Sequence, residues 1–119
     1  MPRMLIVEDE RDIAELLTEF FQAKGFAVSS TFSGEEAIER LNQKDEVDVI
    51  LLDVLLPGVS GLEVLRHAKA RHPRATVVMV SSLDQIDIRR EARSCGAAGY
   101  ITKPFDFSPT TWSVVFNPS

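Results

Sequence analysis

The chain has 119 residues, with 13 basic and 18 acidic side chains and a net charge of −5. This length predicts a single domain, and a composition that is 45% hydrophobic and 26% charged is that of an ordinary globular protein. The single cysteine excludes an internal disulfide and a cysteine-based zinc site. No apolar run approaches the ~20 residues of a membrane span, and the acidic balance disfavours a nucleic-acid-binding face. We therefore expect a cytoplasmic domain that contacts neither membrane nor nucleic acid.

Short apolar runs alternate along the chain with stretches of helical periodicity. The expected strands are residues 4–7, 26–30, 47–52, 76–80 and 99–101. The expected helices run from Glu10 to Lys24, from the Ser33 cap to Leu41, from Leu62 to just before Pro73, and from Asp87 to Cys95. This alternation predicts a parallel sheet with helices on both faces and right-handed crossovers.

Two of the expected helices carry additional signals. The buried face of the first helix is predicted to consist of the apolar residues with helical spacing, Ile13, Leu16, Leu17, Phe20 and Phe21. Before the second helix, Ser33 and Glu36 form a capping box, in which each side chain accepts a hydrogen bond from a backbone N–H near the other residue. These signals define where the two helices begin and which side they bury.

Polar side chains follow four of the expected strands. Glu8 and Asp9 follow the first strand, and Asp53 ends the third. Ser81 follows the fourth strand and Lys103 the fifth. Because ligands bind beyond the carboxyl ends of the strands in an open parallel sheet, we expect these side chains to meet at one edge.

Three carboxylates at one edge repel one another unless something compensates. Two carboxylates ~4 Å apart repel by about 4 kcal/mol at an effective dielectric constant of roughly 20, and one lysine offsets only part of this. Mg²⁺ is the natural complement, because it takes few carboxylates, keeps water and shares phosphate oxygens. The chain has no His or Cys cluster for zinc and no P-loop, and the acids after the first strand would repel a bare phosphate. The remaining interpretation is an aspartate that accepts a phosphoryl group.

Four segments carry a recurrent set of motifs in register. They are MLIVEDE (4–10), LLDVLLPGVSG (51–61), VMVSS (78–82) and GAAGYITKPF (96–105). Together they resemble the receiver domain of bacterial two-component response regulators, over roughly residues 3–106. The resemblance implies a flavodoxin-like, doubly wound sheet of five parallel strands in the order 2-1-3-4-5. It also implies a receiver domain at residues 1–106, followed here by an atypical C-terminal tail at 107–119.

The resemblance implies a magnesium-dependent phosphoacceptor. Asp53 is expected to take the phosphoryl group from the phosphohistidine of a sensor histidine kinase or from a phosphotransfer protein in a phosphorelay. Asp9, Asp53 and the backbone carbonyl of Leu55 are expected to bind Mg²⁺ directly, and Glu8 through water. Such a domain phosphorylates and dephosphorylates itself and serves as a switch, not as a turnover enzyme.

The resemblance also implies how the switch works. Ser81 is expected to hydrogen-bond the phosphoryl group and Lys103 to pair with it. Tyr100 is the expected aromatic switch, which turns inward as Ser81 moves, and the bond between Lys103 and Pro104 is expected to be cis. Phosphorylation would then shift a pre-existing equilibrium at the face formed by the fourth helix and the fifth strand.

The tail departs from the family pattern, in which an amphipathic helix follows the fifth strand. Residues 107–119 contain no Ala, Leu, Glu, Lys or Arg and are rich in β-branched residues, so their helix propensity is poor. We expect residues 110–116 to be extended. The sheet face beside the first helix would then be uncovered, and we expect Trp112, Val114 and Phe116 to cover it, within the chain or across a homodimer.

Two other functions fit the same motifs less well. One is a protein-interaction module of the same fold that is not phosphorylated. The other is a phosphatase with an aspartyl nucleophile, which would favour an acid two residues beyond Asp53, where Leu55 stands. Leu55 and Leu83 offer no polar group to orient an attacking water, so we expect no special acceleration of phosphoaspartate hydrolysis.

Several of these side chains also have a purely structural explanation. Asp53 alone could be a turn residue, Ser81 a strand-end hydroxyl and Tyr100 a half-buried sheet residue. Acids before the first helix also complement its dipole. The arginine cluster of the fourth expected helix is either a solvated face or a surface for an acidic partner; it consists of Arg89, Arg90 and Arg93.

Overall fold

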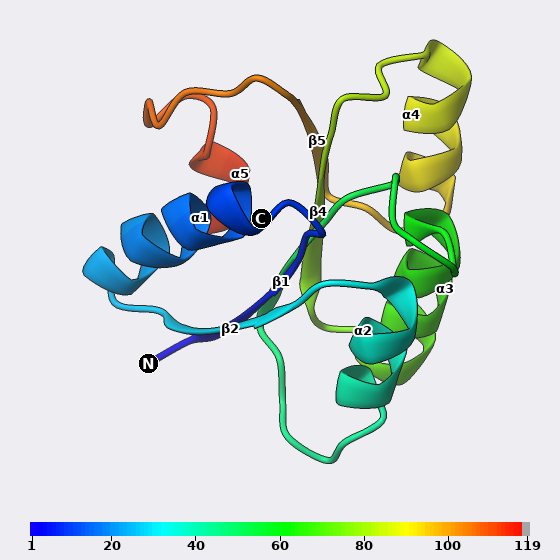
Figure 1. Cartoon of the computed structure of the whole chain (residues 1–119), viewed down its shortest axis with the longest axis horizontal. Coiled ribbons are helices and arrows are strands. Elements are labelled where there is room, and N and C mark those ends of the chain that lie inside the picture. Colours follow the sequence, from blue (N-terminus) through cyan, green and yellow to red (C-terminus); the bar gives the residue numbers. More distant parts are fainter. Residues whose placement is uncertain (118–119) are drawn as a thin grey trace.

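A computed structural model describes residues 1–117 as alternating strands and helices around one sheet (Figure 1). The strands are β1 (Arg3–Val7), β2 (Ala27–Thr31), β3 (Val49–Leu52), β4 (Thr76–Ser81) and β5 (Gly99–Thr102). The helices are α1 (Arg11–Ala23), α2 (Gly34–Leu41), α3 (Gly61–Arg71), α4 (Ile86–Ser94) and α5 (Ser113–Phe116). The last two residues of the expected tail, Pro118 and Ser119, lie outside the described residues. Within residues 1–117, no helix combines the length and apolarity needed to cross a membrane.

The five strands are parallel and lie in the order β2-β1-β3-β4-β5. Figure 1 shows α1 and α5 on one side of this sheet and α2, α3 and α4 on the other. All four residues of β3 are buried, which explains the unbroken apolar run from Val49 to Leu52. The predicted flavodoxin-like, doubly wound fold is confirmed.

The Ser33 half of the predicted capping box is present at the start of α2, and Glu36 bonds the neighbouring N–H instead of that of Ser33. Ser33 Oγ accepts a hydrogen bond from the N–H of Glu36 at 3.1 Å. The Glu36 carboxylate accepts in return from the N–H of Phe32 at 2.9 Å, one residue before the cap. Ser33 thus satisfies a backbone donor that the first turn of α2 leaves free, and Glu36 satisfies one in the chain that leads into the helix.

The predicted buried face of α1 is wrong at one position. Leu16 is 53% exposed, whereas Ala14, Leu17 and Phe21 are fully buried. Because each residue turns a helix by about 100°, Leu16 falls outside the arc centred on Leu17. The spacing of apolar residues alone predicts Leu16 on the buried face.

The extended conformation expected for residues 110–116 is also wrong. The segment forms turns followed by one short helix, α5. An extended chain here would leave its backbone groups without a neighbouring strand, whereas the N–H of Asn117 reaches the carbonyl of Ser113 at 2.7 Å. The short helix pairs these backbone groups within the segment. It forms despite the poor helix propensity of its residues, because tertiary packing overrides that propensity.

The tail nevertheless covers the sheet face beside α1 from within the chain. Trp112 is completely buried, and its indole Nε1 donates to the carbonyl of Asp106 at 2.6 Å. Val115 is buried as well, while Val114 is half-buried and Phe116 is 40% exposed. The prediction is thus confirmed for Trp112, and Val115 takes the place expected for its neighbours. A homodimer is not needed to cover this face.

Candidate functional site

The backbone of the sheet positions three of the predicted site residues at one edge. Hydrogen bonds of the strand ladders continue one residue past the strand ends. The N–H of Glu8 donates to the carbonyl of Thr31 at 3.1 Å, and that of Asp53 to the carbonyl of Val7 at 3.1 Å. The N–H of Lys103 donates to the carbonyl of Ser81 at 3.0 Å. These side chains therefore project from main chain that the sheet holds in place.

A glycine in the following loop also holds Asp53. The loop after β3 returns to the sheet at Gly61, whose N–H donates to the carbonyl of Val54 at 2.9 Å. A Cβ at Gly61 would collide with the backbone carbonyl of Asp53. Only glycine permits this close approach, so the loop that carries the site depends on it.

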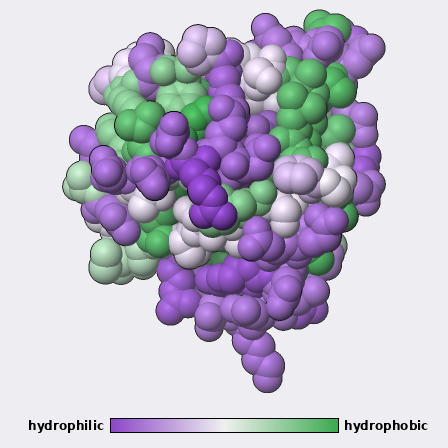
Figure 2. All heavy atoms as spheres, viewed as in Figure 1, coloured by the Kyte–Doolittle hydropathy of each residue, from purple (hydrophilic) through white to green (hydrophobic). Residues whose placement is uncertain are grey.

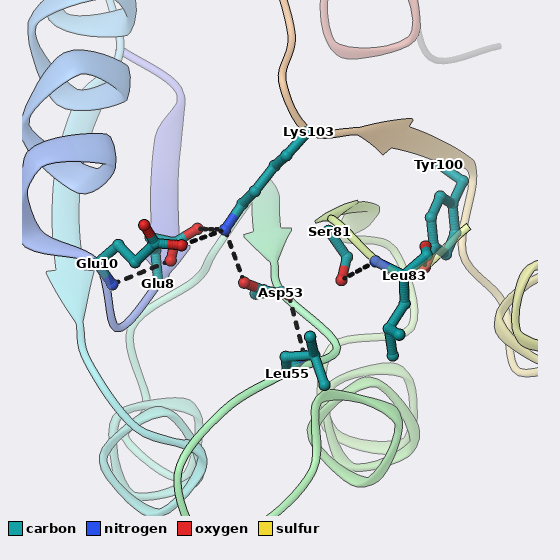
Figure 3. Close-up of polar contacts among 8 residues, drawn as sticks. All are labelled: Glu8, Glu10, Asp53, Leu55, Ser81, Leu83, Tyr100 and Lys103. Carbon is teal, nitrogen blue, oxygen red and sulfur yellow. Dashed lines mark hydrogen bonds and ion pairs between the residues drawn. The ribbon is translucent and has the colours of Figure 1, made fainter. Parts of the chain in front are cut away.

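Lys103 joins the carboxylates of the site (Figure 3). Its Nζ lies 2.8 Å from Asp53 Oδ2, 2.6 Å from Glu8 Oε1 and 3.5 Å from Glu10 Oε1. Glu8, Asp53 and the Lys103 side chain are almost completely removed from solvent, whereas Glu10 is exposed. The peptide bond between Lys103 and Pro104 is cis, as expected. The ammonium thus bridges two buried acids, each of which follows a different strand.

Burial and charge pairing act in opposite directions on these groups. Burial raises the pKa of the Glu8 carboxyl, and the hydrogen bond from Lys103 only partly opposes this. Burial lowers the pKa of Lys103, but its hydrogen bonds to Asp53 and Glu8 outweigh that effect, so the pKa lies above its usual value. The lysine is therefore held in its cationic form, where it compensates the acids around it.

Oxygen atoms of Glu8, Asp9 and Asp53 lie within 4.8 Å of one another. Asp9 is exposed at the mouth of this group, and the other two are buried. Three carboxylates and one ammonium leave negative charge uncompensated, which a divalent cation would neutralise. Carboxylate oxygens are the donors that Mg²⁺ and Ca²⁺ prefer, so the residues fit such an ion. The proximity of Asp9 to Asp53 is the condition on which the sequence-based prediction depended.

Both carboxylate oxygens of Asp53 have a partner. Lys103 pairs with Oδ2, and the backbone N–H of Leu55 donates to Oδ1 at 3.0 Å. The side chain of Leu55 is largely exposed beside the site. The expected role of the Leu55 carbonyl as a metal ligand stays a prediction.

Ser81 and Tyr100 are connected through one residue of the loop after β4 (Figure 3). Ser81 is completely buried, and its Oγ accepts a hydrogen bond from the N–H of Leu83 at 3.3 Å. The hydroxyl of Tyr100 donates to the carbonyl of the same Leu83. Burial raises the pKa of Tyr100, so the hydroxyl stays protonated and able to donate. A movement of the Leu83 backbone would therefore change the hydrogen bonds of both Ser81 and Tyr100.

The sequence-based reasoning missed two residues around this site. Glu10 contributes a third carboxylate to Lys103, and its backbone N–H donates to Glu8 Oε2 at 3.0 Å. Its place in the acidic run after β1 was a usable signal. Arg89 lies over the ring of Tyr100, with its Cζ 4.8 Å from the ring centroid. No sequence pattern pairs these two residues, because the contact depends on how α4 packs beside β5.

The comparisons identify the class of protein that this fold and site define. The family model of the response regulator receiver domain matches residues 4–111. The chain belongs to this family, whose domains act as phosphoacceptor signalling switches of two-component systems.

Individual relatives agree with this assignment. The regulatory protein VanRc of Enterococcus gallinarum is 33% identical over 87% of the chain and 44% of its own length. A cyclic di-GMP phosphodiesterase of Thermotoga maritima is 38% identical over 85% of the chain but only 27% of its own length, so its activity is not carried over. The chain thus spans less than half the length of the curated relatives it matches.

A solved structure of similar size shows the same fold. The response regulator TrrA of Thermotoga maritima, crystallised in complex with Mg²⁺-BeF, is 31% identical and superimposes with a TM-score of 0.82. The match covers 98% of each chain. The likeness therefore extends over the whole receiver fold, including the strand edge that holds the acids.

Proposed function

We propose that Asp53 accepts a phosphoryl group from the phosphohistidine of a sensor histidine kinase or a phosphotransfer protein. The main support is that Lys103 lies 2.8 Å from Asp53, while the oxygens of Asp9 and Glu8 lie within 4.8 Å. A carboxylate beside a buried cation suits an acceptor that becomes more negative on phosphorylation, because the ammonium compensates the added charge. The family membership of the chain points to the same chemistry.

The proposed transfer moves one phosphoryl group from the imidazole of the donor to the carboxylate of Asp53. A carboxylate oxygen of Asp53 forms a bond to phosphorus as the bond from phosphorus to the donor's imidazole nitrogen breaks. The electron pair of the broken bond stays on that nitrogen while the other ring nitrogen carries a proton, so neutral imidazole leaves and the product is an acyl phosphate. Lys103, with its raised pKa, stays cationic and pairs with the negative charge of the transferring group. The hydroxyl of Ser81 would then donate to a phosphoryl oxygen.

The acids fit a resident Mg²⁺, which Asp9, Asp53 and the Leu55 carbonyl would hold directly and Glu8 would hold through water. When bound, the ion would neutralise charge on the phosphoryl oxygens. Lys103 pairs with both Asp53 and Glu8 and so keeps the two carboxylates close together. The N–H of Leu55 orients the Asp53 carboxylate by its hydrogen bond to Oδ1.

Phosphorylation is proposed to act on the face of α4 and β5. Ser81 would move toward the phosphoryl group, and the hydrogen bonds of Leu83 to Ser81 and Tyr100 would transmit the change. The equilibrium between two pre-existing conformations would shift, as for other ligand-biased switches. We propose a cytoplasmic location, where the domain would meet the kinase or phosphotransfer protein that supplies the phosphoryl group.

Incubation with acetyl phosphate or phosphoramidate and MgCl₂ tests the proposal. We expect intact-mass spectrometry to show the gain of one phosphoryl group, which is lost in Asp53→Asn and on addition of EDTA. Ser29→Ala, on the distant edge strand β2, is the matched control and should be labelled like the parent. No gain in the parent would overturn the proposal and favour the unphosphorylated interaction module.

A further inference from the structure

The loop between β3 and α3 follows the phosphoacceptor and is sparsely hydrogen-bonded. At its start, the N–H of Leu55 donates to Asp53 Oδ1 at 3.0 Å (Figure 3). Over residues 56–59, the main chain forms one hydrogen bond in the described part of the chain, from the N–H of Val59 to Glu35 Oε1 at 3.3 Å. Glu35 belongs to α2 and lies 24 positions earlier in the sequence. The middle of the loop is therefore held by a side chain of another helix.

Two glycines bring the first turn of α2 and this loop into direct contact. Gly34, the first residue of α2, is buried, and a Cβ on it would collide with the carbonyl of Val59. Gly58 has a φ of 73°, in the left-handed region, and a Cβ on it would collide with the carboxylate of Glu35. A side chain at either glycine would push the two segments apart. The close packing of the backbone on both sides therefore places the Glu35 carboxylate against the loop.

The other acids of α2 are placed differently. Glu36 accepts a hydrogen bond from the N–H of Phe32 at 2.9 Å, in the chain that leads into the helix. Glu39, one turn beyond Glu35, is exposed and forms no ion pair in the described part of the chain. The helix thus carries one glutamate that contacts the phosphoacceptor loop and one of the same charge, four positions later, that serves as a comparison.

We propose that Glu35 is a positioning residue for the phosphoacceptor site, which holds through Val59 the loop that carries Leu55. This inference rests on the proposed function, in which the Leu55 carbonyl would bind Mg²⁺. Because Mg²⁺ demands near-ideal octahedral geometry, a ligand on a loosely held loop must be ordered when the ion binds, and this ordering costs affinity. A loop that is already ordered also keeps the N–H of Leu55 on Asp53 and so keeps that carboxylate oriented. Glu35 acts through the loop, since its carboxylate bonds Val59 and not Asp53.

Solvent exchange of amide protons, measured by NMR, tests the hold on the loop. We expect the Val59 amide to exchange roughly threefold faster in Glu35→Ala than in the parent, as the loss of one exposed hydrogen bond allows. Glu35→Gln keeps a carbonyl oxygen on the side chain and should exchange nearly like the parent. The matched control is Glu39→Ala, which removes the same charge from the same helix and should leave Val59 unchanged. Equal exchange of Val59 in Glu35→Ala and the parent would overturn the inference.

Titration with MgCl₂ without a phosphoryl donor, followed by the NMR shifts of amides near Asp53, tests the effect on the metal site. We expect the Kd for Mg²⁺ to rise roughly threefold in Glu35→Ala and to stay near the parental value in Glu35→Gln and Glu39→Ala. All three variants remove one negative charge, so the comparison separates the hold on the loop from the attraction by charge. Equal weakening in Glu35→Ala and either of the other variants would show that charge alone acts. That result, or a parent that binds no Mg²⁺, would overturn the inference.

The link to phosphorylation is tested by labelling with acetyl phosphate over a range of MgCl₂ concentrations. We expect the concentration that gives half the maximal rate to rise roughly threefold in Glu35→Ala, while the maximal rate changes less, because saturating Mg²⁺ orders the loop. A labelled parent with the same half-maximal concentration as Glu35→Ala would overturn the inference and leave the proposed function intact. A parent that binds Mg²⁺ but is not labelled would remove the proposed function, while the hold of Glu35 on the metal site is judged by the two NMR measurements.

Discussion

The two faces of the sheet are built from different kinds of side chain. The buried cluster under α2, α3 and α4 contains only aliphatic residues and Met79. The cluster on the side of α1 and α5 contains Phe21, Phe26 and Trp112, with further phenylalanines packed against it. Figure 2 shows apolar atoms at the surface over both the region around α5 and the region beside α4. One face is thus covered by three helices and the other by one full helix and a cluster of rings.

The contrast shows how aromatic side chains can take the place of a longer helix. An aromatic side chain buries roughly 150–250 Å², so a few rings cover the area that a longer α5 would cover. Trp112 is central, because its ring centroid lies 5.2 Å from that of Phe21, 5.3 Å from Phe105 and 6.1 Å from Phe107. We infer that stability on this face is concentrated in one side chain, whereas the aliphatic face distributes it over many.

The strongest test of this contrast is Trp112→Ala. We expect a loss of about 3–5 kcal/mol in the free energy of unfolding, as for other buried aromatic deletions. Urea denaturation measures the loss, and hydrogen exchange should show α5 and α1 losing protection before α2 and α3. Trp112→Phe, which keeps a ring, should lose less. A Trp112→Ala variant with parental stability and parental oligomeric state would contradict the concentration of stability on this side.

Leu65→Ala is the counterpart on the aliphatic face. Leu65 is completely buried in α3, and we expect a loss of about 3 kcal/mol in the free energy of unfolding. Because many neighbours share this cluster, hydrogen exchange should speed up evenly over α2, α3 and the sheet. Selective opening of α3 alone would show that the aliphatic face also depends on single contacts.

Helix capping on the aliphatic face gives a smaller effect. Ser33→Ala removes the cap of α2, and we expect a loss of about 1 kcal/mol in urea denaturation. Ser60 caps α3 through a longer contact, 3.5 Å to the N–H of Glu63, so Ser60→Ala should cost less. The reverse order would mean that the length of the capping bond does not govern the loss.

On the aromatic face, Asp106 makes a contribution to the stability of the fold that depends on pH. Hydrogen bonds from Thr111 and Ser108 hold the pKa of Asp106 below its ordinary value of 3.8. A carboxyl whose pKa is lowered by folding stabilises the folded state at every pH above its pKa in the unfolded chain. This stabilisation is lost as the pH falls through the lower pKa of the folded state. NMR titration of the Asp106 carboxyl should give a midpoint below 3.8, and Thr111→Val should raise it. A midpoint at or above 3.8 in the parent would contradict the role of these bonds.

The smallest effect is expected where the aliphatic side meets the phosphoacceptor site. Leu55 and Leu83 lie in the loops after β3 and β4, and their side chains carry no polar group that could orient an attacking water. If Asp53 is phosphorylated, Leu55→Ala and Leu83→Ala should leave the rate of dephosphorylation nearly unchanged, as measured by the decay of the phosphorylated mass after removal of the donor. A much slower decay in either variant would show that these leucines promote hydrolysis.

Much of the strand edge could be predicted because it depends on local order along the chain. Glu8 and Asp53 directly follow apolar runs and Lys103 directly follows β5, and parallel strands bring such positions to one edge. The sequence-based predictions were wrong where tertiary packing determines the exposure or the conformation of a residue. Leu16 has helical spacing yet faces solvent, and the β-branched tail forms a helical turn because Trp112 fits a space beside α1.

The amino-acid sequence alone determined the alternation of strands and helices, the cap of α2 and the set of charged groups at the edge of the sheet. These follow from side-chain periodicity and from hydrogen bonds between residues a few positions apart. Only the tertiary structure decided that Lys103 bridges Glu8 and Asp53, that Arg89 lies on Tyr100 and that Trp112 closes the face beside α1. Such contacts join residues far apart in the chain, so they depend on how the layers pack and leave no local pattern.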